Sequence, residues 1–546
     1  MPPFEIVLLL LAAVVLSSVI ARTAPLPVPV PLVQIAIGAL MGTVADLPIH
    51  LDPDVFFVLF LPPLLFFDAW RIPKKGLLRD KGKILSLALG LVIATVGGVG
   101  LLVHWMIPAM PLAVAFALAA VISPTDPVAI SSIASRTPVP KRVMSILEGE
   151  ALFNDASGLV CMRFAIVAAL TGSFSMTDIL GNFIWLVAGG LFIGCATTLV
   201  VVAVKEWLSL RYGEDTELQI LVSLLIPFGA YMLADASGCS GILAAVAGGI
   251  TMGQVEQRGG VLAITRVRRN IVWETVQFGA SGIIFILLGE QLPQIAVGAA
   301  GVVREAGHRE VIWLAAYVAV IIGALAALRF AWVWVVLRWT LFRGLHQGRR
   351  VDIQEWRLVA AMSLAGVRGT VTLAGVFTLP LTLMDGRAFP TRDLAIFLAA
   401  GVIIASLTIA NVTLPRLFRG LVLSAEEDEE EIEDVARIRS SEAAIGAIMH
   451  ASSADPTSLD DAGVWRDARA RVFAAYRQRI DAHSKDSSTR SAAHKIDEVE
   501  RRLWLIGCLA ERQEIFRLSR GGRLSDDTAR KLVREVDLLE ARIRLL

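Results

Sequence analysis

Long apolar segments and short polar connections alternate along the first 420 residues of the chain. About 20 apolar residues in a helix are enough to cross the roughly 30 Å hydrocarbon core of a bilayer. By this criterion the pattern predicts thirteen spanning helices, over residues 3–20, 28–45, 54–70, 82–106, 111–134, 141–170, 178–204, 216–236, 240–256, 270–292, 311–338, 355–380 and 393–418. We therefore predict an all-α polytopic membrane protein.

The pattern changes at about residue 420, where a strongly acidic run covers residues 426–434. A block of like charges is typical of a solvated segment. Further along, residues 465–480 and 496–515 carry apolar side chains at helical spacing. We predict two domains: a membrane domain over residues 1–420 and a small helical cytoplasmic domain over residues 421–546.

Composition agrees with a membrane protein and narrows the possible partners. The chain is 55% hydrophobic, which is more than soluble domains carry. Its formal net charge of +1 gives no reason to expect a nucleic-acid partner. The four cysteines are widely scattered and lack the spacing of a metal site, so we predict no cofactor.

Basic residues in the connections predict the orientation of the chain. An odd number of spans places the two termini on opposite sides of the membrane. Lys and Arg are concentrated in residues 71–83 and 266–270, whereas the connections 45–54 and 107–111 contain neither. Because cytoplasmic loops are enriched in Lys and Arg, we predict that the C-terminus is cytoplasmic and the N-terminus is outside.

Two predicted spans are interrupted by residues that break helices. In the fifth, "SPTDP" (residues 123–127) places Asp126 between two prolines, which remove helix hydrogen-bond donors. In the twelfth, "AGVRG" (365–369) places Arg368 beside two glycines. Unwound backbone at this depth persists only where protein buries it or where it lines a cavity. The corresponding positions of the two breaks predict inverted repeats and a secondary transporter with a site at the midplane.

The sixth predicted span carries three carboxylates: Glu148 and Asp155 share one helix face, and Glu150 lies on another. A charge at this depth costs about 3 kcal/mol, so membrane-embedded carboxylates are usually functional. Arg368 needs a buried anion, and we predict that Glu150 is its partner in a structural ion pair. Asp155 would then lack a basic partner and would bind a proton or a cation. The simpler alternative is that Asp155 only hydrogen-bonds between helices.

Five segments together resemble the monovalent cation/proton antiporter family, which includes the prokaryotic NhaP-type antiporters and the sodium/proton exchangers. They are "FFVLFLPPLLFFDAW" (56–70), "SPTDP" (123–127), "GEALFNDASGLV" (149–160), "YMLADASGCSGILAAVAGGITMG" (231–253) and "AGVRGTV" (365–371). The likeness covers about residues 1–420 in the family's order, but not the tail. It implies the NhaA/NhaP-like fold with two broken helices.

The resemblance also implies roles for individual residues. Asn154 and Asp155 fall on the family's Asn-Asp pair, whose aspartate binds the ion and the proton. Thr125 would offer its backbone carbonyl to the ion, and Asp126 would act through water and compensate helix ends. Asp68 would be an accessory ligand. The bound metal would thus be Na⁺ or K⁺ at Asp155, Thr125 and Asp126.

The same resemblance places Glu150 and Arg368 on the family's glutamate–arginine pair and reveals one departure. Many members have a serine directly after that glutamate, where this chain has Ala151. The missing hydroxyl leaves the preference between Na⁺ and K⁺ open, although water, Ser157 or a backbone carbonyl could replace its oxygen. Asn154 together with Arg368 implies the electroneutral branch, with one proton per cation.

The function implied is exchange of Na⁺ or K⁺ for H⁺ across the bacterial inner membrane, in pH homeostasis. The protein would be a transporter and not an enzyme, and it would work as a homodimer by alternating access. The tail would regulate transport or stabilise the dimer, with its ligand unidentified. Two alternatives remain: a cation channel and a non-transporting sensor on the same scaffold.

Overall fold

The computed structural model describes residues 3–24, 28–44, 53–72, 81–126, 139, 141–171, 176–256, 263–305, 312–345, 355–383, 387–419, 424–451, 461–482, 487–520 and 526–545. Two compact units divide the chain, Met1–Val422 and Leu423–Leu546. Throughout these described ranges the regular structure is helical, apart from a single bridge between Thr382 and Ala388. The predicted all-α fold is therefore confirmed.

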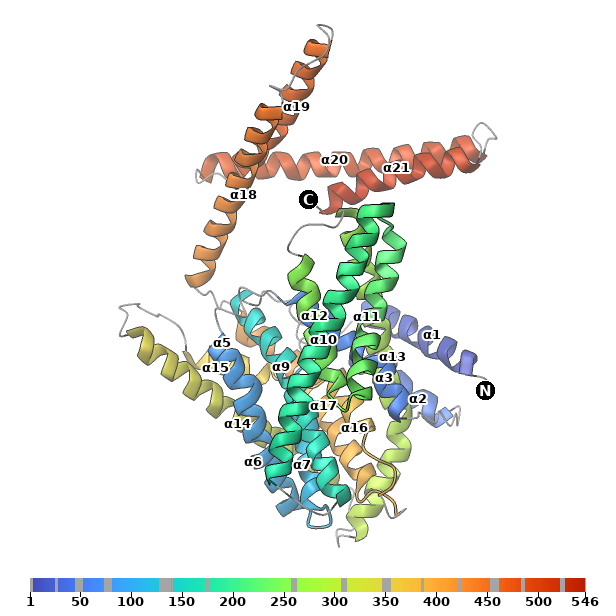
Figure 1. The fold of residues 1–546 in the computed structure, drawn as a ribbon, viewed down its shortest axis with the longest axis vertical. Coiled ribbons are helices and arrows are strands. Elements are labelled where there is room, and N and C mark those ends of the chain that lie inside the picture. Colours follow the sequence, from blue (N-terminus) through green and yellow to red (C-terminus); the bar gives the residue numbers. More distant parts are fainter. Residues whose placement is uncertain are drawn as a thin grey trace. The chain divides into compact units, whose positions relative to one another are not determined.

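The first unit is a bundle of helices (Figure 1). Its elements are α1 (Pro3–Thr23), α2 (Val30–Val44), α3 (Pro53–Arg71), α5 (Lys81–Leu85), the π-helical turn η1 (Ser86–Gly90), α6 (Leu91–Met106), α7 (Leu112–Ile122), α9 (Lys141–Thr171), α10 (Met176–Tyr212), α11 (Thr216–Ala236), α12 (Gly241–Glu256), α13 (Ala263–Glu305), α14 (Ile312–Leu345), α15 (Glu355–Leu364), α16 (Thr370–Phe377) and α17 (Arg392–Phe418). Each of the thirteen predicted segments overlaps one of these helices or a consecutive set of them.

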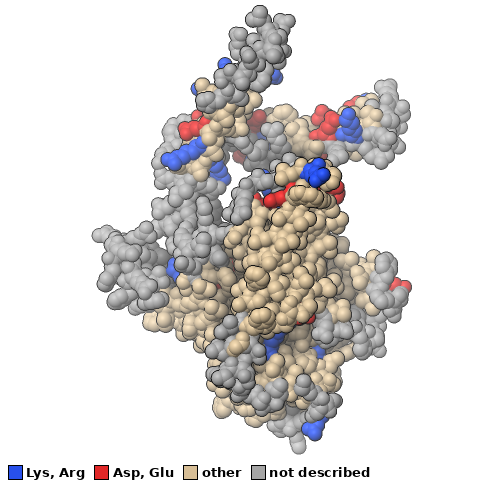
Figure 2. Space-filling view, in the orientation of Figure 1, with Lys and Arg blue, Asp and Glu red and all other residues tan. Residues whose placement is uncertain are grey.

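Eight helices in the described part of the chain are long and apolar enough to cross a membrane. Three shorter apolar helices lie at Val30–Thr43, Leu112–Ile122 and Gly241–Glu256. The space-filling view shows a broad uncharged band over the visible face of the first unit (Figure 2). Because a bilayer excludes charge from such a band, this surface fits a membrane-embedded protein.

Both predicted breaks are present as unwound backbone. Helix α7 ends at Ile122, and residues 123–126 continue without helical structure. Helix α15 ends at Leu364, and α16 begins at Thr370 after a non-helical stretch. The second half of the fifth predicted span, residues 127–138, lies outside the described residues.

Helices α2 and α13 pack at very short range because glycines face each other across the contact. A methyl group added at Gly38 would lie 2.9 Å from the backbone nitrogen of Glu290. One added at Gly289 would lie 2.8 Å from the nitrogen of Ala39. Small residues at such contacts let two backbones approach closely, which is how many membrane helices associate.

The second unit consists of α18 (Ser424–Ala451), α19 (Asp461–Ala482), α20 (Ser487–Arg520) and α21 (Asp526–Leu545). Helices α20 and α21 pack through Cys508 and Ile515 of α20 and Val536 of α21. Arg512 of α20 extends this contact, because its guanidinium donates to acidic residues of α21, Asp537 at 2.7 Å and Glu540. The tail thus contains its own small core.

Candidate functional site

The two unwound segments cross and hydrogen-bond to each other. The backbone N–H of Asp126 donates to the carbonyl of Val367 over 2.7 Å. In the opposite direction, Nε of Arg368 donates to the carbonyl of Ile122 over 2.9 Å. Backbone groups that the breaks deprive of helical partners are therefore satisfied by the other break, as unwound backbone at this depth requires.

The side chain of Asp126 lies at the N-terminus of the half-helix α16. Its Oδ2 accepts a hydrogen bond of 3.1 Å from the backbone nitrogen of Thr370, the first residue of α16. A carboxylate at this position satisfies a free N–H and interacts favourably with the helix dipole. A Cβ at Gly369 would collide with this carboxylate, so the approach requires glycine there.

Asn154 connects helix α9 to the first break. Its Nδ2 donates to the Thr125 hydroxyl over 2.9 Å, and its Oδ1 accepts from the Thr125 backbone nitrogen over 3.5 Å. Both residues are buried. Through these contacts Asn154 fixes the position of Thr125, and hence of the unwound backbone that precedes Asp126.

Asp155, the next residue on α9, has a different environment. It is 5% exposed, and among the described residues no hydrogen bond or salt bridge engages its carboxylate. The carboxylates of Asp126 and Asp68 both lie close enough to act on it electrostatically. Asp68, on α3, accepts a hydrogen bond of 2.7 Å from Gln277 of α13. Three carboxylates from separate elements thus influence one another here.

Glu150 pairs with Arg329 of α14, so the predicted pair of Glu150 with Arg368 is wrong. Arg329 Nη2 lies 2.7 Å from Glu150 Oε2, and Nη1 contacts Oε1, which makes the contact bidentate. Arg329 Nε also donates to the carbonyl of Met362 over 3.0 Å. The Arg368 guanidinium instead donates to the carbonyls of Ile122 and Gly366 at the two breaks.

The sequence contains a signal for this partner. Arg329 stands in the middle of the eleventh predicted span, within "AALRFAWVWVV" (326–336). An arginine flanked by apolar residues needs a buried anion wherever it occurs, and this reasoning applies to Arg329 as much as to Arg368.

Ala151 and Ser157 lie on the same helix as these carboxylates. Ala151 is buried, so the position where many family members carry a hydroxyl faces protein. The Ser157 hydroxyl donates to the carbonyl of Ala88, in the π-helical turn η1, over 2.7 Å. The hydrogen of the Ser157 hydroxyl is thereby engaged in a helix–helix contact.

A second buried ionic cluster, which the sequence analysis missed, lies two residues further along α3 from Asp68. Trp70 Nε1 donates to Glu256 Oε2 over 2.7 Å, and Arg269 pairs with the same carboxylate. The Arg269 guanidinium lies 4.6 Å from the centre of a Trp70 ring, a cation–π geometry. This cluster joins α3, α12 and α13.

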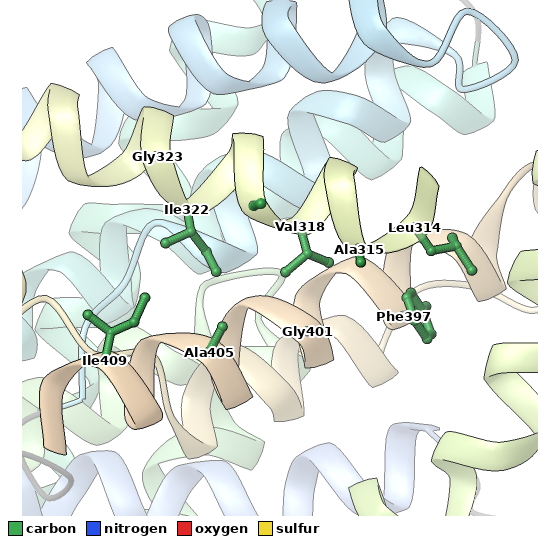
Figure 3. A pocket seen from close by; sticks show the side chains of 10 residues that line it. Leu314, Ala315, Val318, Ile322, Gly323, Phe397, Gly401, Ala405 and Ile409 are labelled. Atoms are coloured by element: carbon green, nitrogen blue, oxygen red, sulfur yellow. The ribbon is translucent and has the colours of Figure 1, made fainter. Parts of the chain in front are cut away.

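A cavity of about 660 Å³ lies between α14 and α17 (Figure 3). Its lining is apolar and consists of Leu314, Ala315, Val318, Ala319, Ile322, Gly323, Phe397, Gly401, Ala405 and Ile409. Such a cavity offers an ion no ligand. Among the residues that the structure describes, no three His, Cys, Asp or Glu side chains are grouped as a metal site. The carboxylates of Asp155, Asp126 and Asp68, near the point where the two unwound segments cross, would instead suit a monovalent ion. Such an ion would be held by few carboxylates together with carbonyl and water oxygens.

Comparison with known proteins identifies the family. Residues 7–420 match the family model described as "Sodium/hydrogen exchanger, transmembrane". An Escherichia coli K12 protein named "Uncharacterized Na(+)/H(+) exchanger YjcE" is 37% identical over 549 residues, which cover 98% of both chains. The chain therefore belongs to the sodium/hydrogen exchanger family, a family of membrane transporters.

Two further matches extend this result. A Bacillus pumilus protein named "Sodium, potassium, lithium and rubidium/H(+) antiporter" is 42% identical over 416 residues, which cover 76% of this chain but only 61% of that relative. The solved structure of the sodium proton antiporter MjNhaP1 from Methanocaldococcus jannaschii matches with a TM-score of 0.57 at 19% identity, over 77% of this chain and 99% of that one. The predicted NhaP-like fold is confirmed by this likeness.

Proposed function

We propose that the protein exchanges Na⁺ or K⁺ for protons, with Asp155 as the group that binds either one. The observation that carries this proposal is the environment of Asp155. It is buried beside two other carboxylates and has no hydrogen-bond or ion-pair partner among the described residues. A carboxylate in such surroundings is stable only when a proton or a cation neutralises it. Binding of one excludes the other, which is the basis of antiport.

The proposed ligands for an alkali cation come from residues near Asp155 along the chain, at the first break and on α3. Such ions prefer oxygen ligands from carboxylates, carbonyls and water. Asn154 holds Thr125 in place, so the Thr125 carbonyl could join the Asp155 carboxylate as a ligand. Asp126 would contribute through water while it caps α16, and Asp68 would contribute from α3. Ion binding would then release the Asp155 proton.

The surroundings of the other acidic residues support an exchange of one proton per cation. Glu150 is neutralised by Arg329, and Asp126 is engaged with the N-terminus of α16. Asp155 is then the carboxylate best placed to exchange its proton during the cycle. Since the proton that leaves and the cation that arrives carry equal charge, transport would be electroneutral.

The membrane setting belongs to the same proposal. We place the protein in the bacterial inner membrane as a homodimer, with the N-terminus outside and the C-terminus in the cytoplasm. The site would open to each side in turn as the crossed helices move against the rest of the bundle. The name of the Bacillus pumilus relative, which includes sodium and potassium, supports testing both ions.

The test is transport by the purified protein in proteoliposomes that contain a pH-sensitive dye. Antiport predicts that Na⁺ or K⁺ added outside enters in exchange for lumenal protons and alkalinises the lumen, and that Asp155→Asn abolishes the signal. Asp235→Asn, the same chemical change at an exposed position of α11, is the matched control. Clamping the membrane voltage should leave the rate unchanged.

Each alternative predicts a different result in this assay. A cation channel would pass Na⁺ or K⁺ without moving protons, and a sensor would pass neither. Full activity of Asp155→Asn would refute the assignment of the site.

A further inference from the structure

Gln277 of α13 is a buried glutamine whose side chain contacts a carboxylate of the candidate site. Its Nε2 donates to Asp68 Oδ1 of α3 over 2.7 Å, and the residue is 9% exposed. An ionised carboxylate only accepts hydrogen bonds, so the amide nitrogen is the donor. The second carboxylate oxygen, Oδ2, makes no hydrogen bond with any described residue. One oxygen of Asp68 is therefore held in place, and the other is left for a ligand.

An aromatic contact one helical turn away sets the position of Gln277. Trp273, four residues earlier on the same face of α13, stacks on two rings of α3. Its ring centre lies 5.5 Å from that of Phe66 and 5.3 Å from that of Phe67. All three aromatic side chains are almost completely buried. The packed contact between α3 and α13 thus continues directly into the hydrogen bond between Gln277 and Asp68.

The hydrogen bond from Gln277 differs from a salt bridge because an amide adds no charge. It favours the charged form of the carboxylate but leaves that charge to be neutralised by something else. Among the described residues no salt bridge engages Asp68. Arg71, one turn further along α3, lies with its guanidinium 5.2 Å from the centre of the Phe67 ring. Asp68 therefore keeps a negative charge, which acts electrostatically on Asp155.

We propose that Gln277 is a positioning residue for cation binding, which orients the Asp68 carboxylate without neutralising it. The inference rests on the proposed function, in which Asp68 contributes to the cation site from α3. Gln277 acts through Asp68 and not on the ion itself. An arginine or a lysine at this place would orient the carboxylate too, but it would supply a permanent counter-charge, as Arg329 does for Glu150.

The half-saturating Na⁺ or K⁺ concentration for transport in proteoliposomes tests this role. Gln277→Leu removes the donor with little change in size. We expect this concentration to rise roughly tenfold, because a hydrogen bond to a charged group is lost. The maximal rate should change less, since Asp155 still carries the proton. Gln219→Leu, the same change at a buried glutamine of α11 that accepts from Lys205, is the matched control and should keep the unaltered value.

Gln277→Lys separates positioning from a merely structural link between α3 and α13. Lysine can still donate to Asp68 and so keep the two helices tied, but it neutralises the carboxylate. We expect cation affinity to fall at least as far as in Gln277→Leu, while the melting temperature stays close to that of the unaltered protein. An unchanged affinity in the lysine variant would overturn the proposal, because a simple link tolerates either donor.

Asp68→Asn shows whether Gln277 acts through Asp68. This variant loses the charge but keeps an oxygen that can accept from the Gln277 amide. Adding Gln277→Leu to it should not weaken cation affinity further, because the carboxylate that Gln277 orients is already absent. Losses that multiply independently in the double variant would place the effect of Gln277 elsewhere and overturn the proposal.

Cation-dependent thermal stabilisation in detergent distinguishes a failure of this inference from a failure of the proposed function. A cation that binds the folded protein raises its melting temperature whether or not transport follows. Transport that Asp155→Asn abolishes, but that Gln277→Leu leaves at unaltered affinity, would overturn the role of Gln277 alone. Stabilisation without transport, weakened by Gln277→Leu, would support Gln277 and overturn exchange. A protein that neither transports Na⁺ or K⁺ nor is stabilised by them would overturn both.

Discussion

Two carboxylates on the same helix, five residues apart, have opposite surroundings. Glu150 lies in a bidentate contact with Arg329, and both side chains are almost completely buried. Asp155 is also buried, but it faces the carboxylates of Asp126 and Asp68 and has no basic partner among the described residues. One helix thus carries a carboxylate with a permanent counter-charge and another whose counter-charge must come from a proton or a cation. Burial alone therefore does not single out Asp155 as the proposed ion carrier; the absence of a permanent counter-charge among the described residues does.

The largest expected effect is the loss of transport when Asp155 is replaced. Asp155→Asn should reduce cation-dependent proton movement to background, because an amide can neither release a proton nor neutralise a cation. Its thermal stability in detergent should stay equal or rise, since the substitution removes a buried charge that has no partner. Transport in proteoliposomes and the melting temperature are the two measurements. A marked loss of stability would contradict the view that Asp155 is unpaired.

Glu150 and Arg329 should behave in the opposite way. Arg329→Met leaves Glu150 buried without a counter-charge, so we expect a loss of about 3–5 kcal/mol in stability. Glu150→Gln should weaken the protein similarly by leaving Arg329 unpaired. The double variant should recover much of the loss, because neither charge then remains. Melting temperatures of the four proteins form a double-mutant cycle, and strictly additive losses would exclude the pair.

Replacing Asp126 should change stability less than replacing Glu150 or Arg329, because its partner is a helix N-terminus and not a full charge. Asp126→Ala removes the acceptor for the Thr370 N–H, and loss of a capping group costs about 0.5–2 kcal/mol. Asp126→Asn retains a capping oxygen and should lose less. Chemical denaturation or thermal melting compares the variants. Equal stability of Asp126→Ala and the unaltered protein would show that the cap contributes nothing.

The smallest effect concerns ion preference. Ala151→Ser restores a hydroxyl at a buried position on the helix that carries both carboxylates. One hydrogen-bond-like contact contributes about 0.5–1.5 kcal/mol, so the ratio of half-saturating Na⁺ and K⁺ concentrations should change by up to about tenfold. Ala156→Ser, a change of the same kind at a buried residue of an apolar cluster, is the control. Equal ratios in both variants would show that residue 151 does not contact the ion.

The helices could be predicted well because hydrophobicity marks the part of a helix that lies in lipid. Helix α11 covers residues 216–236, the range that the apolar pattern predicts. Helix α13 extends from Ala263 to Glu305, well beyond the predicted 270–292. Its additional turns contain arginines such as Arg266, and a hydrophobic criterion cannot detect polar turns that continue a spanning helix.

The site could be predicted only in part, because pairing depends on three-dimensional distance. The two breaks and their chemistry were evident from prolines, glycines and a charge in apolar sequence. The partner of Glu150 was not, since Arg329 and Arg368 offer the same chemistry at very different separations along the chain. What distinguishes them is the place of each side chain in the fold: the Arg368 guanidinium donates to the carbonyls of Ile122 and Gly366 at the crossing, and that of Arg329 contacts Glu150.

The bond from the Asp126 N–H to the Val367 carbonyl joins main chain to main chain. Ordinary mutagenesis exchanges side chains and leaves such a link intact, except where proline removes the N–H itself. Substitutions at 126 or 368 should therefore leave this main-chain bond in place while they remove the contacts of the side chain. An ester in place of that single amide would remove this one bond without changing any side chain.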